Sequence, residues 1–518
     1  MRADDGSISN ADTHNLNAGR SNPARVFFLR RPRAADARRF FYDLAPLFKN
    51  QGKAPVEAVL YFRPMTPQAV DNSESSPWRG IGRLLCAAFV LHLTLSVTLY
   101  EVGRRAVLPD AIDRNGIVVA VASDASDVRD DAEVLSGALG AGEVRGWLGA
   151  DYPLHVKLYA LCFALAGPWL GYNVVAAETL NAFLYLASLV AAFRIGHEVF
   201  DRRAGLLAAV AVALWPSLLL HSTQLLKDPL FVPAFLALVL ILVRLLTSTC
   251  TWARALLTFA AGALVLTALW LTRRNWGWLL IAAVLIGALA LALRAVRERR
   301  ALAPNFVCAA LLLATAFGVP FVMPNALKLG AVRAPGKTTR VVEADRAPAT
   351  QESRDGYVWS RAAARVGDVR RALAGAFPDS GSDIDADVRI SDASDLLSYL
   401  PRAAVIGFFA PFPNMWLTSG KQAGALGRRL AGLECLAMYA VEALALVGLW
   451  RGRERLSVWL LAAVATAGVT ALGVVVVNVG ALYRMRYGFL ALLIIVAAGA
   501  AADLFGVTAR RKIRDLLW

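Results

Sequence analysis

The chain has 518 residues, of which 57% are hydrophobic, and its mean hydropathy is +0.50. A soluble domain is nearer to half apolar and has a negative mean hydropathy. From residue 82 onward the chain contains repeated apolar runs of about 20 residues, the length that crosses a bilayer. The composition therefore excludes a soluble enzyme, a fibrous protein and a secreted disulfide scaffold, and it predicts an all-α integral membrane protein.

Basic residues outnumber acidic residues by 55 to 39, which gives a net charge of +16. In a soluble protein this excess would suggest a nucleic-acid partner. In a membrane protein the excess is explained by cytoplasmic loops beside anionic lipid headgroups. Membrane lipid is therefore expected as a partner, and nucleic acid is not. The cysteines stand singly in or beside apolar runs, which predicts core packing rather than a disulfide or metal site. They are Cys86, Cys162, Cys250, Cys308 and Cys435.

Ten apolar segments have the length of a membrane-spanning helix. They cover about residues 82–100, 174–193, 204–221, 228–246, 254–272, 276–293, 305–323, 429–449, 457–477 and 488–506. If the N-terminus is cytoplasmic, the clusters of arginine between these segments all fall on the cytoplasmic side, as the positive-inside rule expects. The even number of spans places the C-terminus there too. The sequence thus predicts a multi-pass protein of the inner, cytoplasmic membrane.

The predicted spans divide the chain into four parts. Residues 1–81 contain no apolar core long enough for a signal peptide and form a cytoplasmic tail, which either lies on the membrane surface or is a disordered extension. A transmembrane module, 82–324, is expected to hold the catalytic residues and includes a first outer loop, 101–173. A second outer loop, 325–428, precedes a C-terminal transmembrane module, 429–518.

Two further apolar segments are predicted to lie in the outer interface. Counting 152–172 as a span would move Arg194, Arg202 and Arg203 to the outside, so this segment is expected to be an interfacial helix. The segment LLSYLPRAAVIGFFAPFPNMW is broken by three prolines, which excludes an ordinary span and predicts a helix and turn beside a lipid-facing cavity. The alternative is that the segment simply packs against neighbouring spans.

Several cations contradict the positive-inside rule because they lie at the outer ends of short hairpins. They are Lys227, Arg273, Arg274, Arg484 and Arg486. An anion such as a phosphate or pyrophosphate headgroup would compensate them, since guanidinium binds phosphate through two parallel hydrogen bonds. The alternative is pairing with Asp228, with the acidic first loop or with lipid phosphates.

The first outer loop supplies the opposite charge. Residues 101–151 contain ten acidic residues and five arginines, a net charge of −5. A carboxylate at the membrane interface can take a proton from a hydroxyl or amine while that group attacks an electrophilic carbon. The residue types leave open which of the ten acids has this role.

Three segments carry a resemblance to a known family: DDAEVLSGALGAG, DYPLHVKLYALCFALAG, and the span that leads through FDRRAGLL to LWPSLLLHSTQLLKDPLF. They resemble the N-terminal half of the GT-C-type membrane glycosyltransferases, which include the protein O-mannosyltransferases and the aminoarabinose transferases of lipid A. The family pattern has an Asp that opens a juxtamembrane helix, a Tyr-Pro-Pro-like helix start and a Pro-Ser kink. The resemblance is clearest over residues 130–290.

The resemblance implies roles for particular residues. Asp131 corresponds to the general base that activates the acceptor, and Asp130 is the second candidate. The chain departs from the family pattern at Leu135, Leu154 and Glu178, which leaves the identity of the acid and the subfamily open. The implied donor is a polyprenyl-(pyro)phosphate-linked sugar, whose phosphate would bind Arg273, Arg274, Lys227, Arg484 and Arg486.

Two more sets of side chains are expected near the substrates. Substrate contacts are expected at Tyr152, His155, His221 and Asp228. The isoprenoid chain is expected against Phe408, Phe409, Phe412 and Trp416. No His, Asp and Glu spacing typical of a metal site occurs, so no metal or cofactor is expected, although a loosely held divalent ion beside Asp130 and Asp131 stays open.

The predicted function is an inverting transfer of a sugar from the polyprenyl-linked donor to an extracytoplasmic glycan, lipid or protein acceptor. A polymerase of lipid-linked polysaccharide repeat units would need the same residues. A transporter or flippase would instead favour inverted repeats and ionisable groups at the bilayer midplane. A structural scaffold would not need the outer arginines.

Overall fold

The computed structural model describes residues 80–327, 358–376, 382–417 and 424–516. Within these ranges the chain forms helices and no β-strand, apart from an isolated antiparallel bridge between Asp383 and Asn478. The predicted all-α fold is therefore confirmed. The predicted tail lies almost entirely outside the described residues, as do parts of the second outer loop.

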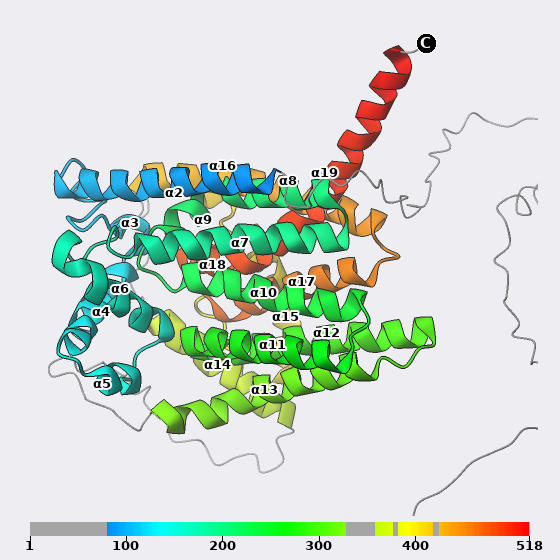
Figure 1. Cartoon of the computed structure of the whole chain (residues 1–518), viewed down its shortest axis with the longest axis horizontal. Coiled ribbons are helices and arrows are strands. Elements are labelled where there is room, and N and C mark those ends of the chain that lie inside the picture. The colour runs from blue at the N-terminus through cyan, green and yellow to red at the C-terminus, as the bar shows by residue number, and fades with distance from the viewer. Residues whose placement is uncertain (1–79, 328–357, 377–381, 418–423, 517–518) are drawn as a thin grey trace, which may run out of the picture. The chain divides into compact units, whose positions relative to one another are not determined.

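Nine helices of the described residues are long and apolar enough to cross a membrane. They are α2 (Ile81–Arg104), α7 (Glu178–Val199), α10 (Asp228–Thr247), α11 (Trp252–Thr272), α12 (Gly277–Glu298), α13 (Ala303–Leu327), α16 (Gly424–Arg451), α17 (Leu456–Val475) and α19 (Tyr487–Leu516). Their ribbons run side by side as a bundle (Figure 1). Long apolar helices satisfy every backbone polar group internally, which is why they suit the bilayer.

Two further helices reach the length and hydropathy of a span only when they are taken together. α8 (Arg202–Ala213) and α9 (Pro216–Ser222) meet at an angle of 66°. Pro216 causes the break because its ring excludes the helical conformation at the preceding residue. Accordingly, Trp215 has an extended backbone and Pro216 starts the second helix. After the bend, residues 223–226 are buried, and Lys227 follows them directly before the first residue of α10.

Small residues allow the bundle helices to approach closely. α7 packs against α8 and α10, and α16 packs against α19. A Cβ atom on Gly205 of α8 would lie 2.5 Å from the carbonyl oxygen of Phe193 on α7. Close contact of this kind is the main source of attraction between helices in a membrane, where lipid tails compete with apolar side chains.

Four helices between α2 and α7 gather at one end of the bundle (left in Figure 1). They are α3 (Val119–Ala122), α4 (Asp124–Gly140), α5 (Val144–Gly149) and α6 (Leu154–Leu170). α6 has 17 residues and packs against α4. The structure thus has a helix in the segment predicted to be interfacial, and its place relative to the bilayer stays a prediction.

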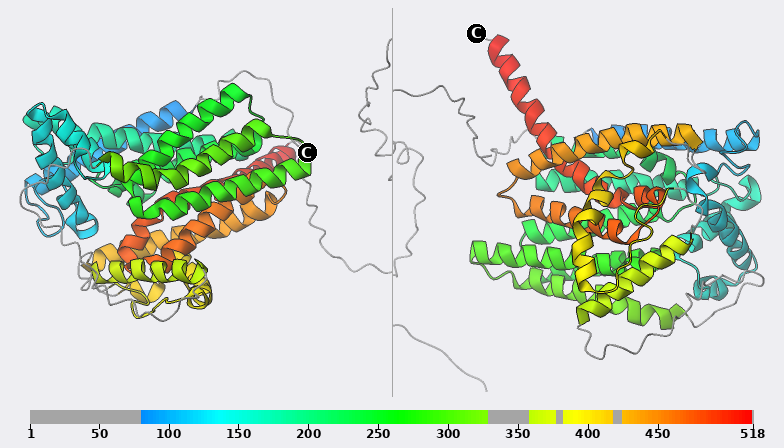
Figure 2. Two further views of the ribbon diagram at one scale, coloured as in Figure 1. Left: turned by 90° about the horizontal axis from the view of Figure 1, so that it is seen from below. Right: turned by 180° about the vertical axis from the view of Figure 1, so that it is seen from behind.

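The segment predicted to be the second outer loop contributes α14 (Val358–Ala376), α15 (Ala393–Phe409) and the short η4 (Pro413–Met415). α14 and α15 contact each other, and both contact α17. Figure 2 shows α15 crossing the bundle helices at a steep angle. α15 continues through Pro401 and ends before Pro411, so the proline-rich segment is a single helix followed by a turn. One more short helix, α18 (Val479–Met485), precedes α19.

Candidate active site

Five charged side chains from distant parts of the sequence meet at the end of the bundle where α4 lies. We call them the charge cluster: Asp124, Lys227, Asp228, Arg273 and Arg484. The Nη1 and Nη2 atoms of Arg484 donate to the two carboxylate oxygens of Asp124 at 2.6 and 2.8 Å. The Nε atom of Arg484 lies 3.2 Å from Asp228, which also pairs with Arg273. Lys227 lies 3.9 Å from Asp124.

Helix ends place these charges. Asp124 is the first residue of α4 and Asp228 is the first residue of α10, where the helix dipole favours a negative charge. Arg273 directly follows α11, and Arg484 lies in the last turn of α18, where the dipole favours a positive charge. Four of the five charges therefore lie at a helix end of complementary polarity, whereas Lys227 is a cation at the N-terminus of α10 and is offset by the two carboxylates beside it.

Burial differs across the charge cluster. The side chains of Arg273 and Asp228 are each 4% exposed, whereas those of Asp124 and Lys227 are 37% and 31% exposed. Burial alone would raise the pKa of Asp124, but Arg484 and Lys227 hold the pKa below its ordinary value. Burial and the nearby Arg273 lower the pKa of Lys227. Three cations against two carboxylates leave one positive charge, which favours binding of an anion.

His155 stands next to the charge cluster as a neutral imidazole. It lies in the first turn of α6 and is 5% exposed. Burial, together with Lys227 and Arg273, lowers its pKa to about 3. Its Nδ1 atom is buried and has no hydrogen-bond partner in the described part of the chain. A neutral histidine with an unused ring nitrogen can exchange a hydrogen bond with a ligand.

The turn that carries Lys227 is held by uncharged buried side chains. The side chain of Gln224 accepts a hydrogen bond from the backbone of Val118 at 2.9 Å. The hydroxyl of Tyr159 donates to the backbone oxygen of Leu226 at 2.9 Å. Gln224 thus connects the turn before α10 to the segment before α4, and this connection fixes Lys227 relative to Asp124. The sequence interpretation missed Gln224 because an uncharged side chain gave no signal.

A second buried network lies between α2, α7 and α9. The Nδ1 atom of His92 is 2.6 Å from Glu178, and its Nε2 atom is 3.0 Å from the hydroxyl of Ser222. All three side chains are buried. Glu178, at which the chain departs from the family pattern, therefore forms part of the packing of the bundle.

His221, one of the residues expected near substrate, lies inside the bundle. Its Nδ1 atom is 2.6 Å from the backbone oxygen of Ser217 and 3.0 Å from the hydroxyl of Tyr487. Ser217 in turn bonds to Glu434 of α16 through its hydroxyl and its backbone nitrogen. These contacts connect α9 with α16 and α19.

Two predicted phosphate-binding arginines lie apart from the charge cluster. Arg274 pairs with Asp151 at 2.7 Å, at a position where both side chains are exposed. Arg486 is 3% exposed and donates to the backbone oxygens of Ala410 and Gly407 at 2.6 and 3.3 Å. Arg486 therefore binds the carbonyl groups that end α15.

The two predicted catalytic acids lie further along α4. Asp131 follows Asp124 by seven residues, about 10 Å along the helix axis. Asp130 pairs with its neighbour Arg129 at 2.5 Å. Asp131 lies close enough to Tyr152 to contribute, after burial, to raising the pKa of the tyrosine. Asp124 is the α4 carboxylate that Arg484 contacts, and its role stays separate from the prediction made for Asp131.

The four aromatic residues predicted to form a lipid groove lie at the end of α15 and in the segment after it. Phe408, Phe412 and Trp416 are half-buried, and Phe409 is 44% exposed. The ring nitrogen of Trp416 donates to the backbone oxygen of Pro411 at 2.8 Å. These side chains gather in one region, and binding of an isoprenoid there stays a prediction.

No group of three or more His, Cys, Asp or Glu side chains arranged to hold a metal ion occurs within the described ranges. In the charge cluster both carboxylates pair with guanidinium groups instead. The cluster therefore supplies two carboxylates and three cations as its chemical groups.

The sequence matches no protein-family model and no curated protein. The structure is similar to that of the archaeal oligosaccharyltransferase AglB from Archaeoglobus fulgidus, solved with an inhibitory peptide and a dolichol-phosphate. The two are 14% identical, with a TM-score of 0.45 over 85% of this chain and 52% of the other. This chain thus spans about half the length of the archaeal protein.

A second similar structure is that of ArnT from Cupriavidus metallidurans, bound to undecaprenyl phosphate. It is 14% identical, with a TM-score of 0.34 over 81% of this chain and 78% of the other. Both comparisons cover more than four fifths of this chain at low sequence identity.

Proposed function

We propose that the protein is a membrane glycosyltransferase that moves a sugar from a polyprenyl phosphate or pyrophosphate to an acceptor outside the cytoplasm. The charge cluster is the observation that carries the proposal. In it, Arg484 contacts both Asp124 and Asp228, and Lys227 approaches Asp124. A carboxylate that can accept a proton therefore adjoins cations that can bind a phosphate, and sugar transfer from a lipid phosphate needs both.

Arg484, Arg273 and Lys227 are proposed to bind the donor phosphate. The cluster has one excess positive charge, and the side chain of Arg273 is only 4% exposed, where attraction to an anion is stronger than in water. Negative charge grows on the phosphate as its bond to the sugar breaks. The cations therefore stabilise the transition state more than the bound donor.

Asp124 is proposed as the general base. Its side chain is exposed enough for an acceptor to reach, whereas Asp228 is buried against Arg273. Asp124 takes the proton of the acceptor as the acceptor oxygen or nitrogen bonds to the anomeric carbon and the phosphate leaves from the opposite face. A phosphate bound to Arg484 shares the guanidinium with Asp124, which raises the pKa of the carboxyl and makes it a better base.

His155 is proposed to bind the donor or the acceptor through its unused ring nitrogen. Because the imidazole is neutral, it can donate a hydrogen bond without adding charge to the site. Asp228 is proposed to hold Arg273 in place rather than to contact substrate. Asp131 remains the alternative base, and an acceptor that extends along α4 would reach it.

The charge cluster is proposed to face the outside of the cytoplasmic membrane, with both termini in the cytoplasm. Basic residues gather at the other ends of the bundle helices, near the end of α7, the start of α8 and the end of α12. They include Arg194, Arg202, Arg203, Arg294, Arg297, Arg299 and Arg300. The positive-inside rule supports placing that end in the cytoplasm.

The test is the mass profile of lipid-linked and surface glycans in a strain that lacks the gene, complemented with variants of equal abundance. Wild type is expected to restore a missing sugar, and Asp124→Asn is expected to lower its amount at least tenfold. Asp127→Asn, an exposed acid one turn further along α4, is the matched control and should restore the sugar. Full activity of Asp124→Asn with loss in Asp131→Asn would move the base to Asp131. An unchanged glycan profile in the deletion strain would contradict the proposed function.

A further inference from the structure

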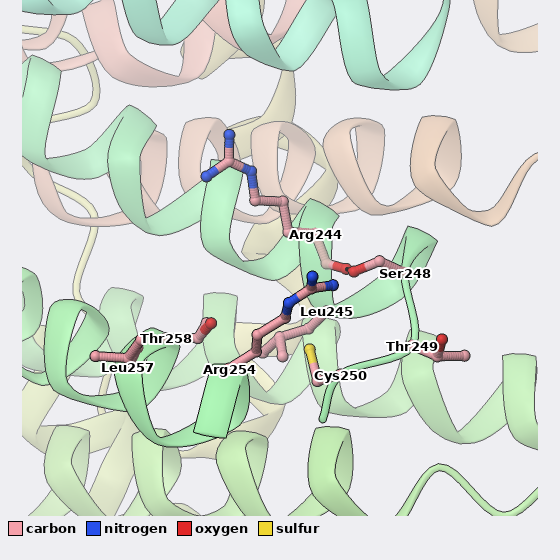
Figure 3. A pocket seen from close by; sticks show the side chains of 8 residues that line it. All are labelled: Arg244, Leu245, Ser248, Thr249, Cys250, Arg254, Leu257 and Thr258. Carbon is pink, nitrogen blue, oxygen red and sulfur yellow. Dashed lines mark hydrogen bonds between the residues drawn. The ribbon is translucent and has the colours of Figure 1, made fainter. Parts of the chain in front are cut away.

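A pocket of about 230 Å³ lies at the end of α10 that is remote from the charge cluster (Figure 3). The turn between α10 and α11 forms its floor. Its lining residues are Arg244, Leu245, Ser248, Thr249, Cys250, Arg254, Leu257 and Thr258. In the view of Figure 3 the guanidinium group of Arg254 lies just above the sulfur of Cys250, whereas that of Arg244 extends away from both.

The position of the pocket along the helix axis places it at the opposite membrane surface. Arg244 follows Asp228 by 16 residues of α10, which corresponds to roughly 24 Å and approaches the thickness of the hydrocarbon core. Trp252, the first residue of α11, is 62% exposed. Tryptophan is enriched at the level of lipid headgroups. The pocket therefore opens at headgroup depth.

The polar half of the pocket contains guanidinium and hydroxyl groups that are available to bind an anion. Arg254 is exposed, and its side chain forms no hydrogen bond or ion pair with the described residues. Arg244 pairs with Glu198 through its Nε atom at 2.9 Å. The hydroxyl groups of Thr249 and Thr258 add further hydrogen-bonding groups to the wall. Guanidinium and hydroxyl groups together suit the oxygen atoms of a phosphate.

Hydrogen bonds from neighbouring helices hold the turn that forms the floor of the pocket. Asn305 of α13 is 1% exposed and binds the turn at three points. It accepts from the backbone nitrogen of Cys250 at 2.9 Å and donates to the backbone oxygens of Leu245 and Ser248 at 2.8 and 2.9 Å. Arg294 of α12 donates to the same oxygen of Ser248 at 2.9 Å. The turn is thus fixed by two neighbouring helices.

The other half of the pocket is apolar and continues down α11. Leu257 is 71% exposed, and Leu264, two helical turns later on the same face, is 72% exposed. A soluble anion would use the arginines and leave this apolar strip unused. A lipid would use both, with its phosphate at the arginines and an acyl chain along the leucines.

We propose that this pocket binds one anionic phospholipid, through its headgroup phosphate at Arg254 and Arg244 and an acyl chain along Leu257 and Leu264. The pocket lies too far from the charge cluster for its ligand to contact both. The proposed lipid is therefore a separate ligand, whose binding does not depend on the proposed glycosyl transfer.

The test uses native mass spectrometry of the purified full-length protein with phosphatidylglycerol, and with phosphatidylcholine of the same acyl chains. Phosphatidylglycerol is expected to give one adduct that is at least tenfold more stable than that of phosphatidylcholine. Arg254→Gln is expected to weaken this adduct about tenfold, since one guanidinium–phosphate contact is lost. Arg297→Gln, an exposed arginine near the end of α12 that does not line the pocket, is the matched control and should leave the adduct unchanged.

Alkylation of Cys250, followed by peptide mass spectrometry, gives a second readout of occupancy. Phosphatidylglycerol is expected to slow this alkylation several-fold in wild type and not in Arg254→Gln. Equal weakening by the two arginine variants would overturn the proposal, because it would show a general attraction of the basic surface. Displacement of the lipid by millimolar inorganic phosphate would also overturn it, because it would show that the apolar strip contributes no binding.

Discussion

Asp124 and Arg484 stand 360 residues apart in the sequence and form a two-point ion pair, with nitrogen–oxygen distances of 2.6 and 2.8 Å. The pair joins the first helix turn of α4 to α18, close to the C-terminal span. It brings a carboxylate from the acidic segment 101–151 to an arginine that the predicted topology makes an exception to the positive-inside rule. The acidic segment 101–151 and the unusual cations at the ends of short hairpins thus contribute side chains to the same site.

Removing Asp228 is expected to destabilise the protein strongly, because Arg273 would remain buried without its partner. Asp228→Asn should lower the free energy of unfolding by about 3–5 kcal/mol, the usual cost of an uncompensated buried charge. Asp228→Asn combined with Arg273→Gln should recover part of this loss. Unfolding in detergent micelles, followed by circular dichroism, measures the two single variants Asp228→Asn and Arg273→Gln and the double variant. A double variant as unstable as the sum of the two single variants would show that the pair contributes no coupling energy.

His155 is expected to make stability depend on pH. Its pKa is about 3 in the folded protein and about 6.5 when unfolded, so between these values the unfolded state binds the extra proton. Stability should therefore fall as the pH drops from about 6.5 toward 3.

His155→Gln has no proton to gain and should show a flatter curve between pH 6.5 and 4.5. Thermal unfolding at a series of pH values measures the difference. Identical slopes for wild type and His155→Gln would show that the imidazole is not held neutral in the folded protein.

Gly205 and Gly137 provide a matched pair for helix packing. An alanine at 205 would place its Cβ atom 2.5 Å from the Phe193 carbonyl, whereas nothing lies within 4 Å of the corresponding position at 137. Gly205→Ala should destabilise the protein by about 1–3 kcal/mol through overpacking between α7 and α8. Gly137→Ala, in the interior of α4, should be neutral or stabilise by up to about 1 kcal/mol. Equal unfolding temperatures for the two variants would argue against the close contact of α7 and α8.

The general fold could be predicted from the sequence because hydropathy depends on local composition. Apolar runs indicated the spans, although the run predicted at 204–221 is divided at Pro216 into α8 and α9. The charge rule also identified Lys227, Arg273 and Arg484 as unusual. These three side chains do meet, since each lies at a helix end at the same surface of the bundle.

The exact members of the site could not be predicted in the same way. Arg484 and Arg486 are two residues apart and look alike in sequence, but Arg484 lies in the last turn of α18 and Arg486 lies in the turn between α18 and α19, so they face different neighbours. Arg484 contacts Asp124, and Arg486 contacts carbonyl groups at the end of α15.

The sequence also could not show which acid of the segment 101–151 lies in the site. Ten acids within 51 residues offered no local distinction, and the contact that distinguishes Asp124 comes from the far end of the chain. One signal was available, since an Asp that opens a juxtamembrane helix describes Asp124, the first residue of α4, better than Asp131.

The most direct test of the central claim is the affinity of the purified protein for undecaprenyl phosphate, compared with undecaprenol, which lacks the phosphate. The charge cluster predicts that wild type binds the phosphate form at least tenfold more tightly, and that Arg484→Gln reduces the affinity to that for undecaprenol. Arg274→Gln, which removes an exposed arginine outside the cluster, should retain the preference for the phosphate. Equal affinity of wild type for the two lipids would contradict the account.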